Sequence, residues 1–312
     1  MTEFKNEFRW SVSKQQTFDT CKRQYYYRYY GMWNGWRRDA SEEARTCYRL
    51  SKMQTLPMLA GTVVHELVEM LLKGVQAQRT LPALVELQEE GRDRLNVAWQ
   101  QSENQRWLQD PKRNANLFEH YYDKEVADER KAEIRARVFD SLTNFYHSPT
   151  FARIRQIPNE SWRSIEDFQK FEIDGVPLSL VMDLAIDIDG ALEIYDWKTG
   201  GVAESNEQQL ITYAICAEQE WGYDLDRIRL NLFYLTENHL APPSRVSPAQ
   251  REEAITAIRH QCELMQSLLV DPINNVAQKG DFVMTDDRRR CEWCFFQELC
   301  YGGPPGQLVL SI

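Results

Sequence analysis

The stretch FEIDGVPLSLVMDLAIDIDGALEIYDWKTGG, residues 171–201, decides the fold of this chain. Two Asp-Gly pairs interrupt its apolar runs, at Asp174-Gly175 and at Asp189-Gly190. Asp and Gly tolerate the positive φ that a two-residue hairpin turn needs. The stretch is therefore predicted to form three short strands joined by two tight turns.

The alternation of side chains along these strands predicts a charged patch on one face of the sheet. Residues two apart in a strand point to the same side, so Asp196 and Lys198 share a face, and Tyr195 and Trp197 point the other way. Asp183, on the preceding strand, can lie beside Asp196 if the register allows. Carboxylates gathered with an ammonium group suit a hard divalent cation, which takes oxygen ligands and offsets the repulsion between the acids. The alternative is a solvated strand with scattered charges, because a D-x-K pattern recurs by accident.

Length and composition allow one large domain with an insertion, or two domains. The chain has 312 residues, of which 43% are hydrophobic and 27% charged. It has no apolar run long enough to span a bilayer, and its first ten residues lack the apolar core of a signal peptide, so we expect a cytoplasmic protein with no membrane partner. The net charge of −10 gives no overall attraction to nucleic acid, and any such binding must use local basic patches.

Residues outside this stretch complete an α/β pattern. A helix is predicted over residues 62–73 with Gly74 as its C-cap, and it carries His65 beside its apolar face. Residues 76–158 read as a helical insertion that either shapes a substrate channel or serves as scaffold. A helix carrying Gln209 and Tyr213 on one face follows the three strands, and a fourth strand is predicted over residues 227–236. The order helix, insertion, three strands, helix, strand predicts an α/β layered core.

An aromatic run, QYYYRYYGMWNGW, occupies residues 24–36 and includes one cation, Arg28. Aromatic rings interleaved with cations can stack on nucleic-acid bases. Such runs also pack in protein interiors, and the sequence leaves the two interpretations evenly balanced.

The cysteines point to a metal centre. A cytosolic chain with seven cysteines favours metal ligands or free thiols over a disulfide framework. Cys291, Cys294 and Cys300 follow one another closely enough to bind one centre, and Cys21 is the candidate for the fourth ligand. Four thiolates suit either zinc or an iron–sulfur cluster, and the spacing does not decide between them. Aromatic residues around the C-terminal cysteines mildly favour the cluster, because they would shield it from water.

The ordered set of motifs resembles a known nuclease family. It comprises Gly61-x-x-x-His65, Asp183, the run DWKTG at residues 196–200, and Gln209-x-x-x-Tyr213. With the cysteines at both ends, this set is similar to the RecB-type branch of the PD-(D/E)XK nucleases. The most similar patterns are those of the iron–sulfur exonucleases of CRISPR adaptation and of the AddB nuclease domain. The opening SVSKQQTFDTCKRQYYYRY, residues 11–29, also resembles that branch.

The resemblance implies roles for the charged residues. It implies a single nuclease domain over residues 1–312 with a restriction-endonuclease-like core. Asp183 and Asp196 would bind Mg²⁺ or Mn²⁺, helped by His65 and by the backbone carbonyl of Trp197. Lys198 would orient or polarise the attacking water.

The resemblance also implies roles for the remaining motifs. Gln209 and Tyr213 would steady the lysine or the DNA backbone. The cysteine quartet would hold a structural 4Fe–4S cluster, and the cluster would join the segments 10–30 and 281–302 as a staple on the fold.

The function expected from this resemblance is metal-dependent hydrolysis of DNA phosphodiester bonds, as an exonuclease on single-stranded ends. The alternative is a non-catalytic DNA-binding or scaffold subunit of a helicase–nuclease or integration complex. The chain has no G-x-x-x-x-G-K-[ST] helicase motif, so any unwinding must come from a partner, such as a helicase or a CRISPR-adaptation or repair protein.

Overall fold

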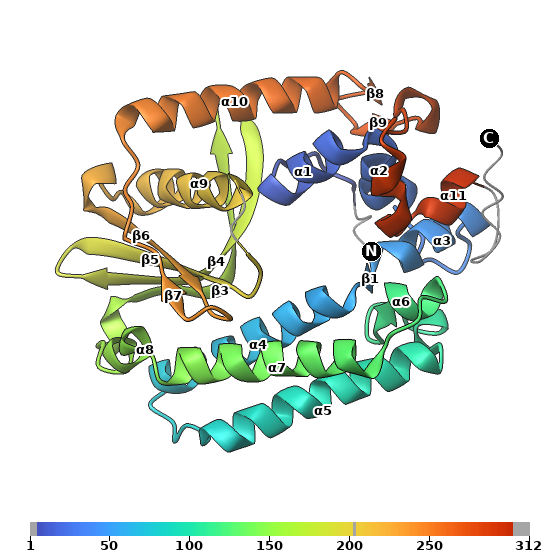
Figure 1. Ribbon diagram of the computed structural model, residues 1–312. Coiled ribbons are helices and arrows are strands. Elements are labelled where there is room, and N and C mark those ends of the chain that lie inside the picture. The colour runs from blue at the N-terminus through green and yellow to red at the C-terminus, as the bar shows by residue number, and fades with distance from the viewer. Residues whose placement is uncertain (1–4, 202–203, 302–312) are drawn as a thin grey trace. The chain divides into compact units, whose positions relative to one another are not determined.

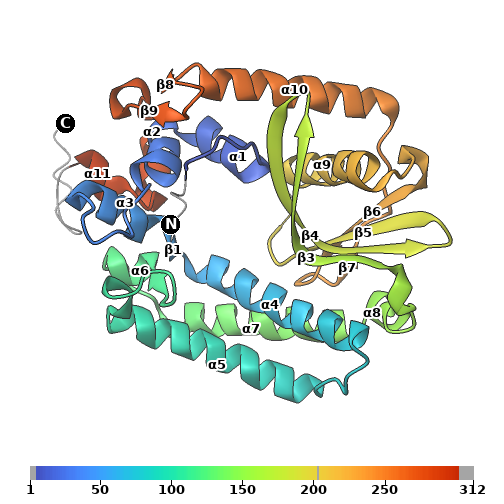
Figure 2. The same cartoon turned by 180° about the vertical axis from the view of Figure 1, so that it is seen from behind.

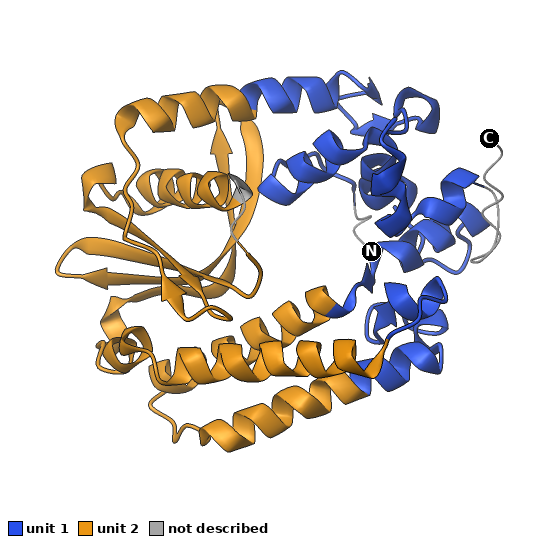
Figure 3. Ribbon diagram, viewed as in Figure 1, with its two compact units in different colours: residues 1–56, 97–126, 259–312 blue, residues 57–96, 127–258 orange. Residues whose placement is uncertain are grey.

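The computed structural model describes residues 5–201 and 204–301. The chain divides into two compact units (Figure 3). Unit 1 comprises residues 1–56, 97–126 and 259–312, and unit 2 comprises residues 57–96 and 127–258. The single nuclease domain over residues 1–312 stays a prediction, and so does the insertion at 76–158, a range that the two units share.

Unit 2 is built on a five-stranded mixed sheet (Figure 1). Its strands, in spatial order, are β3 (Trp162–Ile173), β4 (Val176–Ile188), β5 (Ala191–Lys198), β6 (Ile228–Tyr234) and β7 (His239–Leu240). Neighbouring strands are antiparallel except β5 and β6, which are parallel. A parallel pair needs a crossover, and the helix α9 (Glu204–Trp221) lies in that connection. The predicted order of three strands, helix and strand is therefore confirmed.

Both hairpin turns form where the sequence predicts them. Asp174 and Gly175 have φ values of 50° and 79°, and Asp189 and Gly190 have 53° and 76°. All four residues are left-handed, as the common two-residue hairpin turn requires. The first strand was predicted too short, because β3 begins at Trp162 instead of residue 171. Its added part is mostly polar, but pairing with β4 continues along it and satisfies the backbone.

Helices pack on both faces of this sheet. Trp197 on β5 contacts Phe145 of α7 (Asp128–Tyr146) at a ring distance of 5.1 Å. Oδ1 of Asp196, its neighbour in the strand, lies 3.3 Å from the hydroxyl of Tyr213 on α9. The two residues therefore face opposite layers, as the alternation predicts.

Three long helices of unit 2 lie side by side in both views (Figures 1 and 2). They are α4 (Leu56–Gln76), α5 (Leu84–Glu103) and α7; the ends of α4 and α5 extend into unit 1. A Cβ at Gly91 of α5 would lie 3.0 Å from Val138 and 3.4 Å from Leu67, so this glycine permits the close approach. The helix predicted over 62–73 is longer at both ends, and Gly74 is not its C-cap but an interior residue, because the helix runs to Gln76 and the left-handed residue that follows it is Gln78, with a φ of 52°.

Unit 2 has two further α-helices. The short helix α8 (Pro149–Ile154) follows α7, and the long helix α10 (Pro248–Gln266) follows the sheet. The C-terminal end of α10 belongs to unit 1.

Unit 1 gathers short elements from both ends of the chain and from residues 97–126. Its helices include α1 (Val12–Thr20), α2 (Lys22–Tyr26), α3 (Glu42–Ser51), α6 (Phe118–Tyr121) and α11 (Gln297–Tyr301). Its paired strands are β1 (Met53–Gln54) with β2 (Asn116–Leu117), and β8 (Leu269–Asp271) with β9 (Val276–Ala277). A buried cluster of Tyr27, Leu50, Phe118 and Phe296 joins these segments. None of the helices in the described part of the chain is long and apolar enough to cross a membrane.

Candidate functional site

Three potential metal ligands converge in unit 2 from three different elements. His65 lies on α4, Glu166 on β3 and Asp183 on β4, and one ligand atom from each lies within 4.8 Å of the others. Nδ1 of His65 is 3.2 Å from Oε1 of Glu166 and 3.6 Å from Oδ1 of Asp183. The sequence predicted His65 and Asp183 for this site, but it did not predict Glu166.

Glu166 owes its position to an irregularity of the β3 backbone. Its φ of 52° is left-handed, which is uncommon for a residue inside a strand. The flanking pairs Ile165↔Leu184 and Asp167↔Met182 place Glu166 opposite Asp183 across the two strands. Like charges opposite each other in a sheet are destabilising, so this pair is consistent with a cation between them. The acidic residue was visible in the sequence, but its strand was predicted to begin after it.

Asp183 and Asp196 lie on adjacent antiparallel strands. The pair Leu184↔Tyr195 sets the register, so that Asp183 comes beside Asp196. Asp183 is also tied to β5 directly, because the backbone N–H of Trp197 donates to its Oδ2 at 2.6 Å. Trp197 was predicted to act through its carbonyl; the contact found here uses its amide, and the carbonyl's role stays a prediction.

A chain of polar contacts fixes Lys198. Its Nζ lies 2.8 Å from Oδ2 of Asp196 and donates to Oε1 of Gln209 at 2.8 Å. The Gln209 amide donates to the Tyr213 hydroxyl at 2.6 Å, and this hydroxyl is 2.6 Å from the Val181 carbonyl, to which it donates. The structure therefore brings Gln209 and Tyr213 to the lysine, as the resemblance implies.

The backbone that follows Lys198 is held by α7 and by the segment after β6. Leu235 donates its N–H to the Lys198 carbonyl at 2.7 Å, and Asn144 of α7 donates to the Leu235 carbonyl at 2.8 Å. Thr236 donates its hydroxyl to the Thr199 carbonyl at 3.0 Å. These contacts were not foreseen from the sequence, since they join backbone groups far apart in the chain.

The charges of this site are not balanced. Three carboxylates, Glu166, Asp183 and Asp196, face two cationic groups, His65 and Lys198. Burial alone would lower the pKa of His65, but the charges and hydrogen bonds of Asp183 and Glu166 raise it to about 10. Burial, and then the charge of Asp183, raise the pKa of Asp196 to about 6, while burial also raises the pKa of Glu166. A divalent cation would relieve the excess negative charge.

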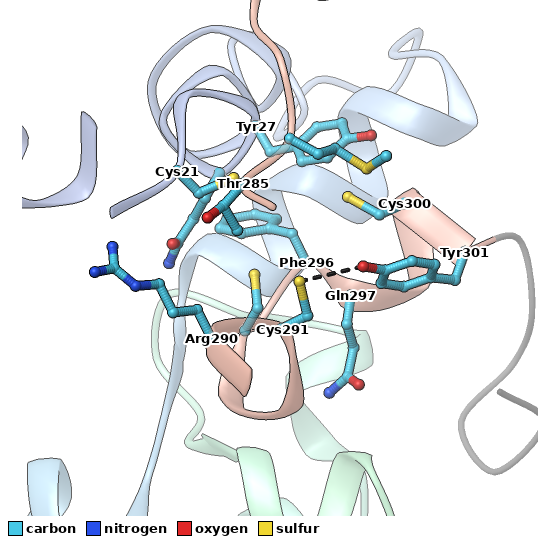
Figure 4. Close-up of a pocket in the computed structure, with 12 residues that line it drawn as sticks. Cys21, Tyr27, Thr285, Arg290, Cys291, Phe296, Gln297, Cys300 and Tyr301 are labelled. Atoms are coloured by element: carbon cyan, nitrogen blue, oxygen red, sulfur yellow. Dashed lines mark hydrogen bonds between the residues drawn. The ribbon is translucent and has the colours of Figure 1, made fainter. Parts of the chain in front are cut away.

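The four predicted cysteine ligands line one cavity in unit 1 (Figure 4). Cys21 is in extended backbone between α1 and α2, Cys291 lies in a short 3₁₀ helix, Cys294 caps that helix, and Cys300 lies on α11. Burial above all, and also the charges of the other three thiols, raise the pKa of Cys294 to about 12. The structure thus brings Cys21 to the same cavity as the three C-terminal cysteines, with which the sequence grouped it.

The spacing and surroundings of these thiols bear on what they hold. Within the described part of the chain, no three of the sulfur atoms lie within 4.8 Å of one another. Four thiolates fit the donor set of either a zinc ion or an iron–sulfur cluster. The Tyr301 hydroxyl also donates to Sγ of Cys291 at 3.2 Å (Figure 4).

The sequence profile of the PD-(D/E)XK nuclease superfamily matches residues 9–301, which is nearly the whole chain. The chain therefore belongs to the PD-(D/E)XK nuclease superfamily. Members of this superfamily are typically nucleases that hydrolyse phosphodiester bonds of DNA and use divalent metals such as Mg²⁺ or Mn²⁺. The mixed sheet covered by helices fits the predicted fold class. A search of curated proteins finds no match to this chain.

Proposed function

We propose that this protein is a DNA exonuclease that hydrolyses phosphodiester bonds from single-stranded ends. The observation that carries the proposal is the convergence of His65, Glu166 and Asp183 beside Asp196, which holds Lys198 at 2.8 Å. Acidic oxygens next to a fixed amine are the parts that phosphodiester hydrolysis needs, because both the attacking water and the scissile phosphate require charge stabilisation.

In this proposal the carboxylates of Glu166, Asp183 and Asp196 and the ring of His65 hold Mg²⁺ or Mn²⁺. Their donor set fits such an ion, since carboxylate oxygens dominate it and the site has excess negative charge without one. The chemistry that a divalent ion supplies at such a site is activation of water and stabilisation of charge on the phosphate. The Trp197 amide fixes the orientation of Asp183 through its hydrogen bond to Oδ2.

Lys198 places a positive charge beside the reacting phosphate. It is only 22% exposed at its side chain, and Asp196 and Gln209 restrict its ammonium group. A restricted charge costs little reorganisation during the reaction, which is why it contributes more than a mobile one. Tyr213 acts through Gln209, because its hydroxyl accepts from the Gln209 amide and is anchored on the Val181 carbonyl.

We assign the chain to the RecB-type branch, similar to the AddB nuclease domain and the exonucleases of CRISPR adaptation, and we assign a structural 4Fe–4S cluster to Cys21, Cys291, Cys294 and Cys300. The cavity that the four cysteines share supports this assignment. A helicase, or a CRISPR-adaptation or repair protein, would supply unwound DNA. The wild-type protein should be brown, and substitution of Cys294 by Ser should bleach it. A colourless wild-type protein with stoichiometric zinc would show that the site holds zinc instead of the cluster.

The function is tested by digestion of end-labelled single- and double-stranded DNA with Mg²⁺ or Mn²⁺. Wild type should shorten single strands from an end, and Asp196→Asn should lose about a thousandfold in rate while still binding DNA. The matched control is Asp189→Asn, the same change at an exposed turn residue whose left-handed φ of 53° Asn tolerates. Equal activity of wild type and Asp196→Asn would refute the mechanism. A wild type inert on every DNA form would favour the scaffold-subunit alternative.

A further inference from the structure

The aromatic run of residues 24–36 divides between the interior and the surface of unit 1. Tyr25 and Tyr27 are buried, with 1% and 0% of their surfaces exposed, and Tyr25 packs near Phe282. Trp36, at the other end of the run, is 44% exposed. Tyr25 and Tyr27 therefore belong to the core, whereas the exposed Trp36 needs another explanation.

A tight turn before α3 packs against this helix and carries the two tryptophans. Asn34 has a left-handed φ of 62°, and a Cβ at Gly35 would lie 2.1 Å from the Ala44 carbonyl oxygen and 2.6 Å from Cβ of Tyr48. Only glycine allows the backbone to approach α3 so closely. The turn places Trp36 5.7 Å from the Tyr48 ring, at an interplanar angle of 63°.

The aromatic group continues along the turn and ends in a cation. Trp33 contacts Trp36 with ring centroids 5.2 Å apart, and Nζ of Lys52 lies 5.4 Å from the centroid of the Tyr48 ring. Trp33, Trp36, Tyr48 and Lys52 thus form a continuous row, which we call the tryptophan row.

Further cations surround Lys52 without acidic partners. Burial, and then the charges of Lys112 and Arg28, lower the pKa of Lys52, so both of these cations act on Lys52. Within the described residues, neither Lys52, Lys112 nor Arg28 has a carboxylate within ion-pair distance. Asp110 is near Tyr48, but Arg113 pairs with it at 3.8 Å. The chain as a whole has a net charge of −10, so this local positive charge is a place where an anionic ligand can bind.

We propose that the tryptophan row, with Arg28 and Lys112, binds single-stranded DNA. The exposed ring of Trp36, beside cations without carboxylate partners, suits this ligand, because bases stack on aromatic rings while the phosphates meet the cations. The bases of a duplex are already stacked on each other, so a duplex meets only the cations. The choice of DNA rests on the proposed function, but the site itself is separate in sequence and in structural unit from Asp196.

The test is fluorescence anisotropy of a labelled oligo-dT with the full-length protein, without added divalent cations. Trp36→Ser should weaken binding about tenfold, and Trp36→Phe, which keeps a ring, should restore most of it. Lys52→Gln should weaken binding and reduce the dependence of log Kd on log salt by about 0.7, the value for one lost phosphate contact on a single strand.

The matched controls remove the same chemistry elsewhere. Ile273→Ser deletes an apolar side chain that is 95% exposed, and Arg92→Gln deletes one positive charge from α5. Both should bind oligo-dT within about twofold of wild type. The proposal is overturned if Trp36→Ser binds like these controls, or if a duplex of equal length competes as well as the single strand. Melting temperatures of all variants show whether the fold is retained.

Failure of this site and failure of the proposed nuclease are distinguishable. Oligo-dT binding that depends on Trp36, in a protein that cleaves nothing, would overturn the nuclease and keep the site. Cleavage that depends on Asp196, in a protein whose Trp36→Ser variant binds normally, would do the reverse. If both are right, Trp36→Ser should raise KM about tenfold with kcat nearly unchanged, because it removes binding remote from the reacting bond.

Discussion

Divalent-ion affinity should rise with pH, because the ion must displace a proton from His65. Nδ1 of His65 lies 3.2 Å from Glu166 and 3.6 Å from Asp183. Burial alone would favour the neutral ring, but these two carboxylates raise its pKa to about 10. The ring is therefore protonated at neutral pH in the metal-free protein, whereas a metal ligand must be neutral imidazole.

The size of the effect follows from this pKa. A pKa of about 10 leaves about one ring in 10³ neutral at pH 7, which weakens ion binding by about 4 kcal/mol at about 1.4 kcal/mol per pKa unit. Between about pH 7 and pH 9 the affinity should rise about tenfold per pH unit, with one proton released per ion. Below about pH 6 the fall should steepen, because Asp196, whose pKa is raised to about 6, then also binds a proton.

Isothermal titration calorimetry with Mn²⁺ measures both quantities. The titrations are run without oxygen. At each pH the heat of Mn²⁺ binding is measured in several buffers of different ionisation enthalpy, and the dependence of this heat on the buffer gives the number of protons released. His65→Gln should abolish the tenfold slope between about pH 7 and pH 9. The control is His147→Gln, because His147 is exposed just after α7 and should leave the slope unchanged.

Two results would refute this reasoning. One is a wild-type affinity that stays constant across that range with no proton released. The other is a His65→Gln variant that keeps the wild-type slope, which would mean that a group other than His65 gives up the proton.

Three further substitutions have defined outcomes. Gly35→Ala should lower Tm by about 5 °C, the effect of about 2 kcal/mol of overpacking. The control Gly280→Ala, with open space around the new Cβ, should leave Tm unchanged. Equal Tm values for the two variants would contradict the tight turn. Tyr301→Phe removes the hydroxyl that lies 3.2 Å from Sγ of Cys291. Because hydrogen bonds to the sulfur atoms tune the reduction potential of a cluster, this variant should have a lower potential in an EPR-monitored titration. An unchanged potential would argue against this contact. Tyr213→Phe should lower kcat about tenfold with KM unchanged in steady-state cleavage assays, and a change in KM alone would instead place Tyr213 in DNA binding.

Local chemistry made much of the fold predictable. The two Asp-Gly turns depend only on adjacent residues that tolerate positive φ, and the register that they set brings Asp183 beside Asp196. The same alternation placed Trp197 on the opposite face. These features follow from short-range rules, which a single sequence contains in full.

Other features depend on tertiary contacts and could not be read from the sequence. Glu166 was missed because the polar start of β3 lacks a strand pattern and is stabilised by pairing with β4. Gly74 resembles a helix C-cap, but the helix continues past it to Gln76, and Gln78 adopts the left-handed φ of 52° instead. Composition could not separate buried Tyr27 from exposed Trp36, because packing alone decides which aromatic residues reach the surface.

The most direct test of the account is an anomalous difference map from crystals soaked in Mn²⁺. The account predicts one strong peak that appears only after the soak, apart from the iron signal of the proposed cluster, within about 2.5 Å of carboxylate oxygens of Glu166, Asp183 and Asp196 and of a ring nitrogen of His65. A Mn²⁺-dependent peak elsewhere in the protein, or no such peak at saturating Mn²⁺, would contradict it.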